Sequence, residues 1–435
     1  MTTAQQLANE LLEFIYESPT AFHAVLNVEA ELKNSGYAEL HKEQPWNIER
    51  GGKYYLKEND SAIFAFNIGI GEVEREGFRI ISSHTDSPSF KLKPRAEINT
   101  EGTYITLNTE VYGAPIMSTW QDRPLSVAGR VTVATDNFLP KQYFVNIKRP
   151  ILIIPNLGIH FNRNVNEGVS LNPQKHMLPL MTLDTINSGK KNYITDLLSS
   201  ELNIEEGKIL DYELFLYEFE KGTIIGLRNE FISSGRLDNL ASVHAALKAF
   251  KAVKESEAIN VLACFDNEEV GSATRQGADS EVLPHALERI LLSLGKTRED
   301  LFIAYAKSFM ISADQAHAVH PTLSEKYDPI NRAYINEGPV IKISSAQKYT
   351  SDSITSGAYE MLCRRADIPV QKFTNRSDER GGTTIGPIAS AHLPIMSVDI
   401  GIPILAMHSV RELGGVEDYK YMTQSFVEFF GGRKR

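Results

Sequence analysis

The feature that most constrains the fold is a pattern that occurs five times: an apolar, strand-like run that ends in a side chain able to bind a metal. The five segments are ISSHTDSPS, SGRLDNLASV, FDNEEVGS, FMISADQAHAVHP and IPILAMHSVRE. In an open α/β sheet, ligands bind beyond the carboxyl ends of the strands, so loops that follow strands bring functional side chains together. The pattern therefore predicts an α/β fold with a site at one edge of its sheet.

The pattern of residues along the chain changes after Pro94. Residues 100–155 carry short alternating segments rich in Val, Ile, Thr and Tyr, whereas strand and helix patterns lie on both sides of this block. Because neither side alone has enough strands for a full sheet, an insertion is favoured over a separate tandem domain. We therefore predict one discontinuous domain made of residues 1–93 and 231–435, with a β-rich domain of residues 94–230 inserted into it.

Charge and composition exclude several classes of function. The net charge of -10 argues against nucleic-acid binding, which needs a basic face. Two cysteines cannot make a disulfide framework in a chain of 435 residues, and they suit a reducing compartment. The N-terminal segment has no basic leader before an apolar block, and no stretch approaches the roughly 20 apolar residues of a spanning helix. These observations predict a cytoplasmic protein with neither a nucleic-acid nor a membrane partner.

Each polar residue in the five segments also has an ordinary structural interpretation. A single histidine such as His84 or His408 is more often a hydrogen-bonded buried histidine, and Asp238 or Asp314 could cap a helix or a turn. Taken together, however, two histidines and several carboxylates all follow apolar runs. Zinc accepts histidine nitrogen and carboxylate oxygen, and the set lacks the thiolates of a structural zinc site. The combination therefore favours a zinc site that does chemistry.

Three acids gather within four positions of each other, at Asp266, Glu268 and Glu269. A hydrolytic metal site needs one carboxylate on the metal and a second, not bound to it, that takes a proton from water. Adjacent residues of an extended segment point in opposite directions, so a turn at a strand end could divide these two tasks between the glutamates. Without a metal the acids would repel each other, and at least one carboxyl should hold its proton.

The motifs HTDSP, GRLDNL, FDNEEVGS, SADQAHAVHP, GPVIK, GGTTIGP and AMHSVRE, in this order and at these spacings, resemble the aspartyl aminopeptidase family of dinuclear zinc exopeptidases. The resemblance covers about residues 10–430. It implies a zinc-peptidase-like central sheet flanked by helices, with the inserted β-rich domain serving in dimerisation and assembly. It also implies two Zn²⁺ per subunit (other divalent ions would suit the same donors), peptide substrates with a free N-terminus, and a homo-oligomer, a dodecamer built from dimers.

The resemblance also implies roles for individual residues. Five of them are implied to be metal ligands: His84 and Asp314 on one zinc, Glu269 and His408 on the other, and Asp238 between the two. Glu268 would be the general base that takes a proton from the metal-activated water and returns it to the leaving amine. Asp86 would orient His84, as carboxylates next to ligating histidines often do.

Two further residues come from the same resemblance. His160 would reach the active site of a neighbouring subunit and help to stabilise the oxyanion; its alternative is an ordinary surface histidine. Lys342 would line the side-chain pocket and favour Asp or Glu by charge pairing; its alternative is a solvated strand lysine. The chain departs from the family pattern at Glu379 and Arg380, which leaves the roles of these two charges open.

The main prediction is a zinc-dependent aminopeptidase that prefers Asp or Glu at the N-terminus of its substrate. Three alternatives stay open: an aminopeptidase that takes neutral residues, a metal-dependent amidohydrolase acting on N-acylated amino acids, and an assembly scaffold with a vestigial metal site. The place of the insertion and the AMHSVRE motif favour the peptidase over the amidohydrolase. The intact Glu268 speaks against the scaffold, which has no need of a base.

Overall fold

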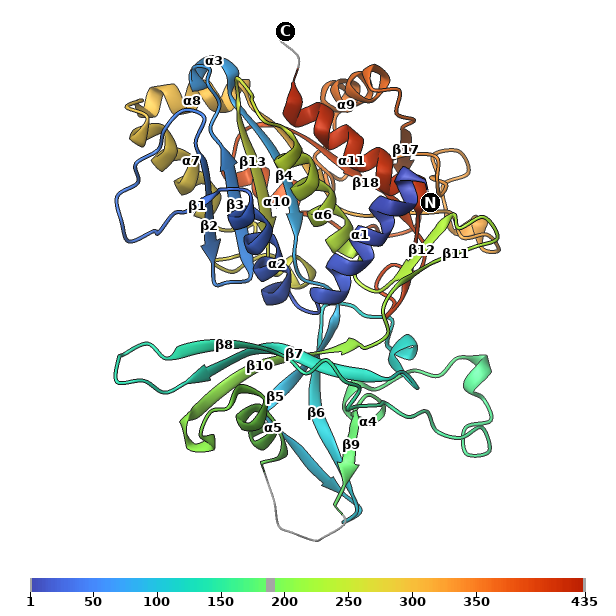
Figure 1. Ribbon diagram of the computed structural model, residues 1–435. Coiled ribbons are helices and arrows are strands. Elements are labelled where there is room, and N and C mark those ends of the chain that lie inside the picture. Colours follow the sequence, from blue (N-terminus) through green and yellow to red (C-terminus); the bar gives the residue numbers. More distant parts are fainter. Residues whose placement is uncertain (1, 185–191, 433–435) are drawn as a thin grey trace. The chain divides into compact units, whose positions relative to one another are not determined.

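The computed structural model describes residues 2–184 and 192–432, and the chain forms two compact units (Figure 1). The first unit comprises Met1–Asp86, Gly222–Met407 and Glu412–Arg435. The second comprises Ser87–Lys221 together with the short segment His408–Arg411. None of the helices in the described part of the chain is long and apolar enough to cross a membrane.

A nine-stranded mixed sheet forms the centre of the first unit, counted over the described residues. Neighbouring strands β13, β4, β14 and β18 all run parallel, so their carboxyl ends meet at one edge. In spatial order the strands are β1 (Ala38–Glu39), β2 (Lys53–Glu58), β3 (Ala62–Asn67), β13 (Ile259–Phe265), β4 (Phe78–His84), β14 (Phe309–Ala313), β18 (Met396–Gly401), β16 (Val340–Ile343) and β17 (Gln371–Thr374).

The middle strands of this sheet are mostly apolar because both of its faces are covered. All seven residues of β13 are buried. Alternate residues enter two different hydrophobic cores: Leu262 and Ile81 lie in one core, and Val261 and Ile80 in the other. A continuous apolar run in the sequence thus marks a strand between two helical layers, as the α/β prediction requires.

Helices from distant parts of the chain form these two layers (Figure 1). The first core takes residues from α1 (Thr3–Glu17), α2 (Ala21–Asn34), α6 (Leu237–Ala252), α9 (Ser353–Arg365) and α11 (Val416–Gly431). The second core takes residues from α3 (Val73–Glu76), α7 (Val282–Ser293), α8 (Arg298–Lys307) and α10 (Ile385–His392). The predicted α/β class, with helices flanking a central sheet, is therefore confirmed.

Local sequence signals explain where several elements begin and end. The break between α1 and α2 falls at Ser18 and Pro19, where the sequence predicts it, and Thr2 begins α1 with a capping box. Asn59 and Asp60 connect β2 to β3 with φ angles of 55° and 53°, the left-handed conformation that two-residue hairpin turns of Asn and Asp favour. Two small sheets complete this unit: β11 (Thr223–Ile225), β12 (Phe231–Ser234) and β20 (Glu412–Gly415), and the pair β15 (Ala316–His317) and β19 (Pro403–Ile404).

The second unit is built on an antiparallel sheet of six strands within the described residues. Its alternating residues, such as Phe90, Leu107 and Val127, bury one face against α5 (Tyr193–Leu202). Pro94, where the residue pattern of the sequence changes, lies within β5, at a shift of register between Leu92 and Glu97. The strands follow the order β8 (Lys141–Asn146), β7 (Leu125–Val133), β10 (Ile209–Glu218), β5 (Ser89–Thr100), β6 (Tyr104–Tyr112) and β9 (Leu180–Leu183), with the short helix α4 (Pro173–His176) beside them.

Candidate metal centre

Three neighbouring strands of the first unit end at the same level of the sheet. His84 is the last residue of β4 and pairs in register with Phe265, the last residue of β13. Asp314 directly follows β14, which pairs with β4 on the other side. Because parallel neighbours deliver their following loops to one edge, residues far apart in the sequence meet there.

His84 is the central side chain of this edge and is 1% exposed. Its Nε2 lies 3.3 Å from Asp238 Oδ1 and 3.6 Å from Asp314 Oδ1. Its Nδ1 lies 3.1 Å from the backbone oxygen of Asp86 and 3.3 Å from Asp86 Oδ1. Burial alone would lower the pKa of His84, but the hydrogen bonds to these acids raise it well above its usual value. One ring nitrogen therefore faces an orienting carboxylate and the other faces the acids of the site.

Asp238 reaches the site from the first turn of α6, where its backbone is not helical. A cis peptide bond joins it to Asn239. The backbone N–H of Asp238 donates to Glu412 Oε2 over 3.0 Å, and the side-chain amide of Asn239 donates to the backbone oxygen of Ala313 over 2.8 Å. Gln315 in turn donates from Nε2 to Asn239 Oδ1 over 3.0 Å. Buried hydrogen bonds thus tie the Asp238 segment to the end of β14.

Glu268 and Glu269 begin a short 3₁₀ turn (Glu268–Val270) just beyond β13. The backbone N–H groups of these two residues donate to the two carboxylate oxygens of Asp86, each over 3.2 Å. Burial raises the pKa of Glu268 to about 8, and the charges of Asp314, Asp238 and Asp86 add to this effect while His84 opposes it. This agrees with the expectation that one carboxyl holds its proton when no cation is bound.

The donor atoms of this edge fit a divalent metal ion such as zinc. His84, Asp238 and Asp314 each offer one ligand atom, and these atoms all lie within 4.8 Å of one another. His84, Glu268 and Glu269 form a second group with the same property. A histidine nitrogen with carboxylate oxygens is a donor set that zinc accepts, and a cation there would offset the mutual repulsion of the acids.

Lys342 lies next to this cluster and is itself only 2% exposed. Its Nζ lies 3.3 Å from Asp314 Oδ2 and donates to the backbone oxygen of Gln315 over 3.1 Å. The alternative of a solvated strand lysine is therefore wrong. Of the two charges whose roles the sequence leaves open, Glu379 forms an ion pair with Lys326 at 3.3 Å, and Arg380 is exposed.

His408 and His160 both belong to the second unit. The backbone oxygen of His408 accepts from the N–H of Ile116 over 2.9 Å, and its Nδ1 lies 3.1 Å from the backbone oxygen of Ala114. His160 is exposed in a loop beside Phe161, which is 84% exposed. The roles of both histidines at the metal centre remain predictions.

Sequence reasoning assigned no role to three buried residues that support the centre, namely Asn239, Gln315 and Glu412. Asn239 and Gln315 each directly follow an acid of the cluster, and Glu412 closes the AMHSVRE motif. A polar residue directly beside a candidate ligand was the signal that could have identified Asn239 and Gln315, whereas Glu412 carries no such signal. Their partners in the fold, by contrast, cannot be read from the sequence.

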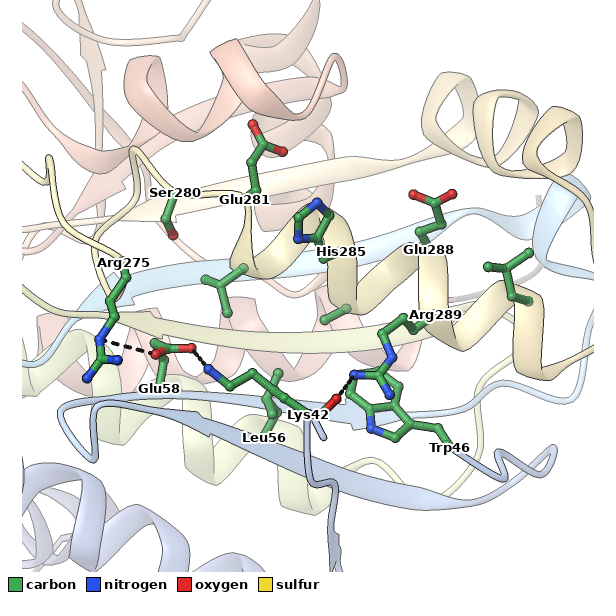
Figure 2. A pocket seen from close by; sticks show the side chains of 13 residues that line it. Lys42, Trp46, Leu56, Glu58, Arg275, Ser280, Glu281, His285, Glu288 and Arg289 are labelled. Carbon is green, nitrogen blue, oxygen red and sulfur yellow. Dashed lines mark hydrogen bonds and ion pairs between the residues drawn. The ribbon is translucent and has the colours of Figure 1, made fainter. Parts of the chain in front are cut away.

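A separate hollow of about 530 Å³ lies in the first unit between α7, β2 and the segment before β2 (Figure 2). Its charges are largely satisfied: Glu58 pairs with Lys42 and lies 3.5 Å from Arg275, and the Arg289 guanidinium stacks 3.9 Å from the centre of a Trp46 ring. Among the described residues that line it, none belongs to the acid and histidine cluster. This hollow is therefore separate from the candidate metal centre.

Comparisons with known proteins agree with this geometry. The family model described as aminopeptidase I zinc metalloprotease (M18) matches residues 14–430. The chain is 57% identical over 426 residues to a probable M18 family aminopeptidase 2 of Clostridium novyi (strain NT), with 98% of each chain covered. A structure of the Ape4 and Nbr1 complex superposes with a TM-score of 0.95 at 38% identity, covering 99% of this chain and 86% of the other. The structure of the S. cerevisiae mApe1 dodecamer gives 0.85 at 26% identity, covering 99% and 97%.

Proposed function

The chain belongs to the M18 family of zinc aminopeptidases, and from that premise we propose that it uses two zinc ions to release Asp or Glu from the N-terminus of peptides. The observation that carries the proposal is the meeting of His84, Asp238, Asp314 and the two glutamates at one sheet edge. Family membership supports the zinc and the aminopeptidase chemistry. The number of ions and the preference for acidic residues are the proposed refinements.

Each ion would take two ligands of its own and share a third. One ion would take His84 and Asp314, the other would take Glu269 and His408, and Asp238 would bind both. The group of His84, Asp238 and Asp314, whose ligand atoms lie within 4.8 Å of one another, supports the first part of this division. When bound, zinc polarises the scissile carbonyl and lowers the pKa of a water molecule, which is the chemistry that peptide hydrolysis requires.

The protein's own residues orient and move protons around that chemistry. Asp86 holds the Nδ1 side of His84, which leaves Nε2 directed at the acids. Glu268, which is not needed as a ligand, would accept a proton from the attacking water and return it to the leaving amine. Its backbone is held by Asp86, so the base would keep its position while its carboxyl group gains and loses a proton.

Two charge effects support selection of the substrate. The acids around His84 would attract the free ammonium group of a peptide, which confines cleavage to the first peptide bond. Lys342 supplies a buried positive charge beside Asp314, and that charge would favour an acidic side chain at the first position. An N-acylated substrate lacks the ammonium group, so the proposal disfavours the amidohydrolase alternative.

The second unit would serve in assembly. Leu157, Ile159 and Phe161 are exposed around His160, at 59%, 51% and 84%. Exposed apolar residues of this kind are typical of a surface that another chain covers. We expect this loop to pack on a second copy of the chain and to bring His160 to the neighbour's metal centre, in a dodecamer built from dimers. The dodecameric state of the similar mApe1 structure supports this expectation.

The cysteines support a cytoplasmic location. Cys264 and Cys363 are both buried free thiols, and Cys264 lies on β13 directly below the metal centre. Free thiols persist in a reducing compartment. Cell fractionation followed by zinc-dependent peptidase assays of each fraction would test the location.

The function is tested by turnover of chromogenic Asp-, Glu- and Leu-amides and an N-acetylated control, before and after chelation and zinc restoration. Fast cleavage of the Asp- and Glu-amides that chelation abolishes and zinc restores is the expected result. Fast cleavage of the Leu-amide would remove the acidic preference and keep the zinc chemistry. Cleavage of the acetylated control alone would indicate an amidohydrolase, and inactivity on all four would favour the scaffold.

A further inference from the structure

We propose that Lys342 is a positioning residue that divides the two carboxylate oxygens of Asp314 between different partners: Oδ2 for its own ammonium group and Oδ1 for the metal. The inference rests on the proposed zinc site but not on its peptidase activity. It gives Lys342 a task in every turnover, in addition to any contact with an acidic substrate.

The ammonium group of Lys342 is enclosed on several sides. Its side chain is 3% exposed, and that of Asp314 is 12% exposed. Nζ lies 3.3 Å from Asp314 Oδ2, donates to the Gln315 backbone oxygen over 3.1 Å, and lies 5.3 Å from the centre of the Tyr349 ring. A buried ammonium needs such partners, because an unpaired buried charge is strongly unfavourable. Lys342 is therefore held in one position.

The two carboxylate oxygens of Asp314 face different partners. The oxygen that faces His84 Nε2, at 3.6 Å, is Oδ1, whereas Lys342 takes Oδ2. With Oδ2 occupied, the carboxylate cannot rotate freely and presents one oxygen to the cation. Hydrogen bonds to ligating carboxylates commonly hold metal ligands in place, and losing such a partner typically lowers metal affinity or activity about 10- to 100-fold.

Lys342 and Asp314 meet across strand β18. Lys342 lies on β16 and Asp314 follows β14, and β18 runs between these two strands. Gly401, the last residue of β18, lies so close to Asp314 that an added Cβ would be 1.9 Å from the Asp314 backbone oxygen. The absence of a side chain at Gly401 allows the Asp314 backbone to pack directly on β18, and Lys342 can then reach over that strand.

The position of the Tyr349 ring is fixed by hydrogen bonds of the next residue in the chain. Thr350, the next residue, donates from its backbone N–H and its hydroxyl group to Asp399 Oδ2, over 2.6 and 2.8 Å. Asp399 is fully buried on β18. Tyr349 is 5% exposed and cannot swing away without breaking these bonds. Lys342 thus lies between a fixed ring and a ligand whose orientation it controls.

The test compares zinc binding and turnover in three variants of the full oligomeric protein. Lys342→Met removes the charge at similar length, Lys342→Arg keeps it, and Lys348→Met removes an exposed lysine of the neighbouring loop as the matched control. Zinc affinity is measured by competition with a chromogenic chelator in the absence of substrate. KM and kcat are measured separately for the Asp-amide and the Leu-amide.

We expect Lys342→Met to lower the affinity for one zinc about 10- to 100-fold, and to lower kcat by similar factors on both amides. Lys342→Arg should retain zinc within a few-fold, and Lys348→Met should match the unmodified protein. Unchanged zinc affinity in Lys342→Met, with a higher KM for the Asp-amide alone, would overturn the inference. If Lys342→Met does not fold, a fall in zinc affinity of about 10-fold or more in the folded Lys342→Arg, which keeps the charge, would overturn it instead.

An inactive but zinc-binding protein would refute the proposed peptidase function and leave this measurement valid. The two proposals can therefore fail separately. The zinc titration addresses only the support of Asp314, whereas the amide assays address the reaction.

Discussion

Asp86 Oδ1 accepts the backbone N–H of Glu268 over 3.2 Å while it also lies 3.3 Å from His84 Nδ1. A single carboxylate thus fixes both the histidine of the candidate metal centre and the segment that carries the proposed base. The second oxygen of Asp86 holds the N–H of Glu269 in the same way. The distance between the acids and the histidine is therefore set by one buried side chain and does not depend on the flexibility of the loop.

Asp86→Asn should impair zinc binding and turnover together. The asparagine has the same shape, but its NH₂ group can only donate, and it would face either the N–H of Glu269 or both His84 and the N–H of Glu268. We expect an affinity for zinc about 10- to 100-fold lower and a comparable fall in kcat. Chelator competition and steady-state kinetics measure the two effects. A variant that binds zinc normally and turns over normally would show that Asp86 does not orient the site.

Glu268→Gln should separate proton transfer from metal binding. The amide keeps the size of the side chain but cannot take a proton from water, so kcat should fall about 10²- to 10⁴-fold. Zinc affinity should stay within a few-fold of the unmodified protein, because Glu268 is proposed as a base and not as a ligand. An equal loss of zinc and of activity would instead assign Glu268 to the metal.

Gly401→Ala should damage the centre through packing alone. The new methyl group would lie 1.9 Å from the Asp314 backbone oxygen, so backbone must move, at a cost of about 1–3 kcal/mol in the free energy of unfolding. Gly357→Ala, in helix α9 with no atom within 4 Å of the added carbon, is the matched control and should stabilise the protein by about 0.5–1 kcal/mol. Urea unfolding of both variants measures the difference. A neutral Gly401→Ala would contradict the close approach of these segments.

His392→Gln should change the pH dependence of stability. His392 Nε2 and Nδ1 each lie 2.8 Å from a carboxylate oxygen, of Asp279 and Glu281 respectively. These bonds raise the pKa of His392 above its usual value. Because the folded pKa is the higher one, the stabilisation is fully present below the unfolded pKa of about 6.5 and is lost as the pH rises through the folded value. The free energy of unfolding of the unmodified protein should therefore exceed that of the variant most at about pH 6 and least at about pH 9.

The measurement is the free energy of unfolding of both proteins at several pH values in one buffer series. A gap between the two proteins that does not change with pH would mean that the histidine contributes by packing and not by its charge.

The sequence predicted the position of His84 and Asp314 because each follows an apolar run, and such runs become central strands in a sheet with two covered faces. The two tasks assigned to the glutamate pair stay a prediction. The sequence could not predict that Asp86 bonds to the backbone of both glutamates, because that contact arises only when β13 and β4 become neighbours.

Lys342 illustrates a second limit of sequence reasoning. Alternation along VIKI indicates which face the lysine occupies, but not whether that face is open to water. Its burial follows from the place of β16 beside β18 and from the absence of a side chain at Gly401, and both depend on residues far away in the chain. Periodicity predicts the direction of a side chain, whereas the surrounding elements decide its solvation.

The strand order of the central sheet determines when the active site can assemble during synthesis on the ribosome. β4 carries His84 early in the chain, yet its two neighbours, β13 and β14, are synthesised only after the long segment Ser87–Lys221 of the second unit. Since the carboxylates that complete the centre arrive with those later strands, the emerging chain has no assembled active site. The topology thereby delays peptidase activity at least until Asp314 has been synthesised, so the enzyme's own N-terminus leaves the ribosome before an assembled active site exists that could cleave it.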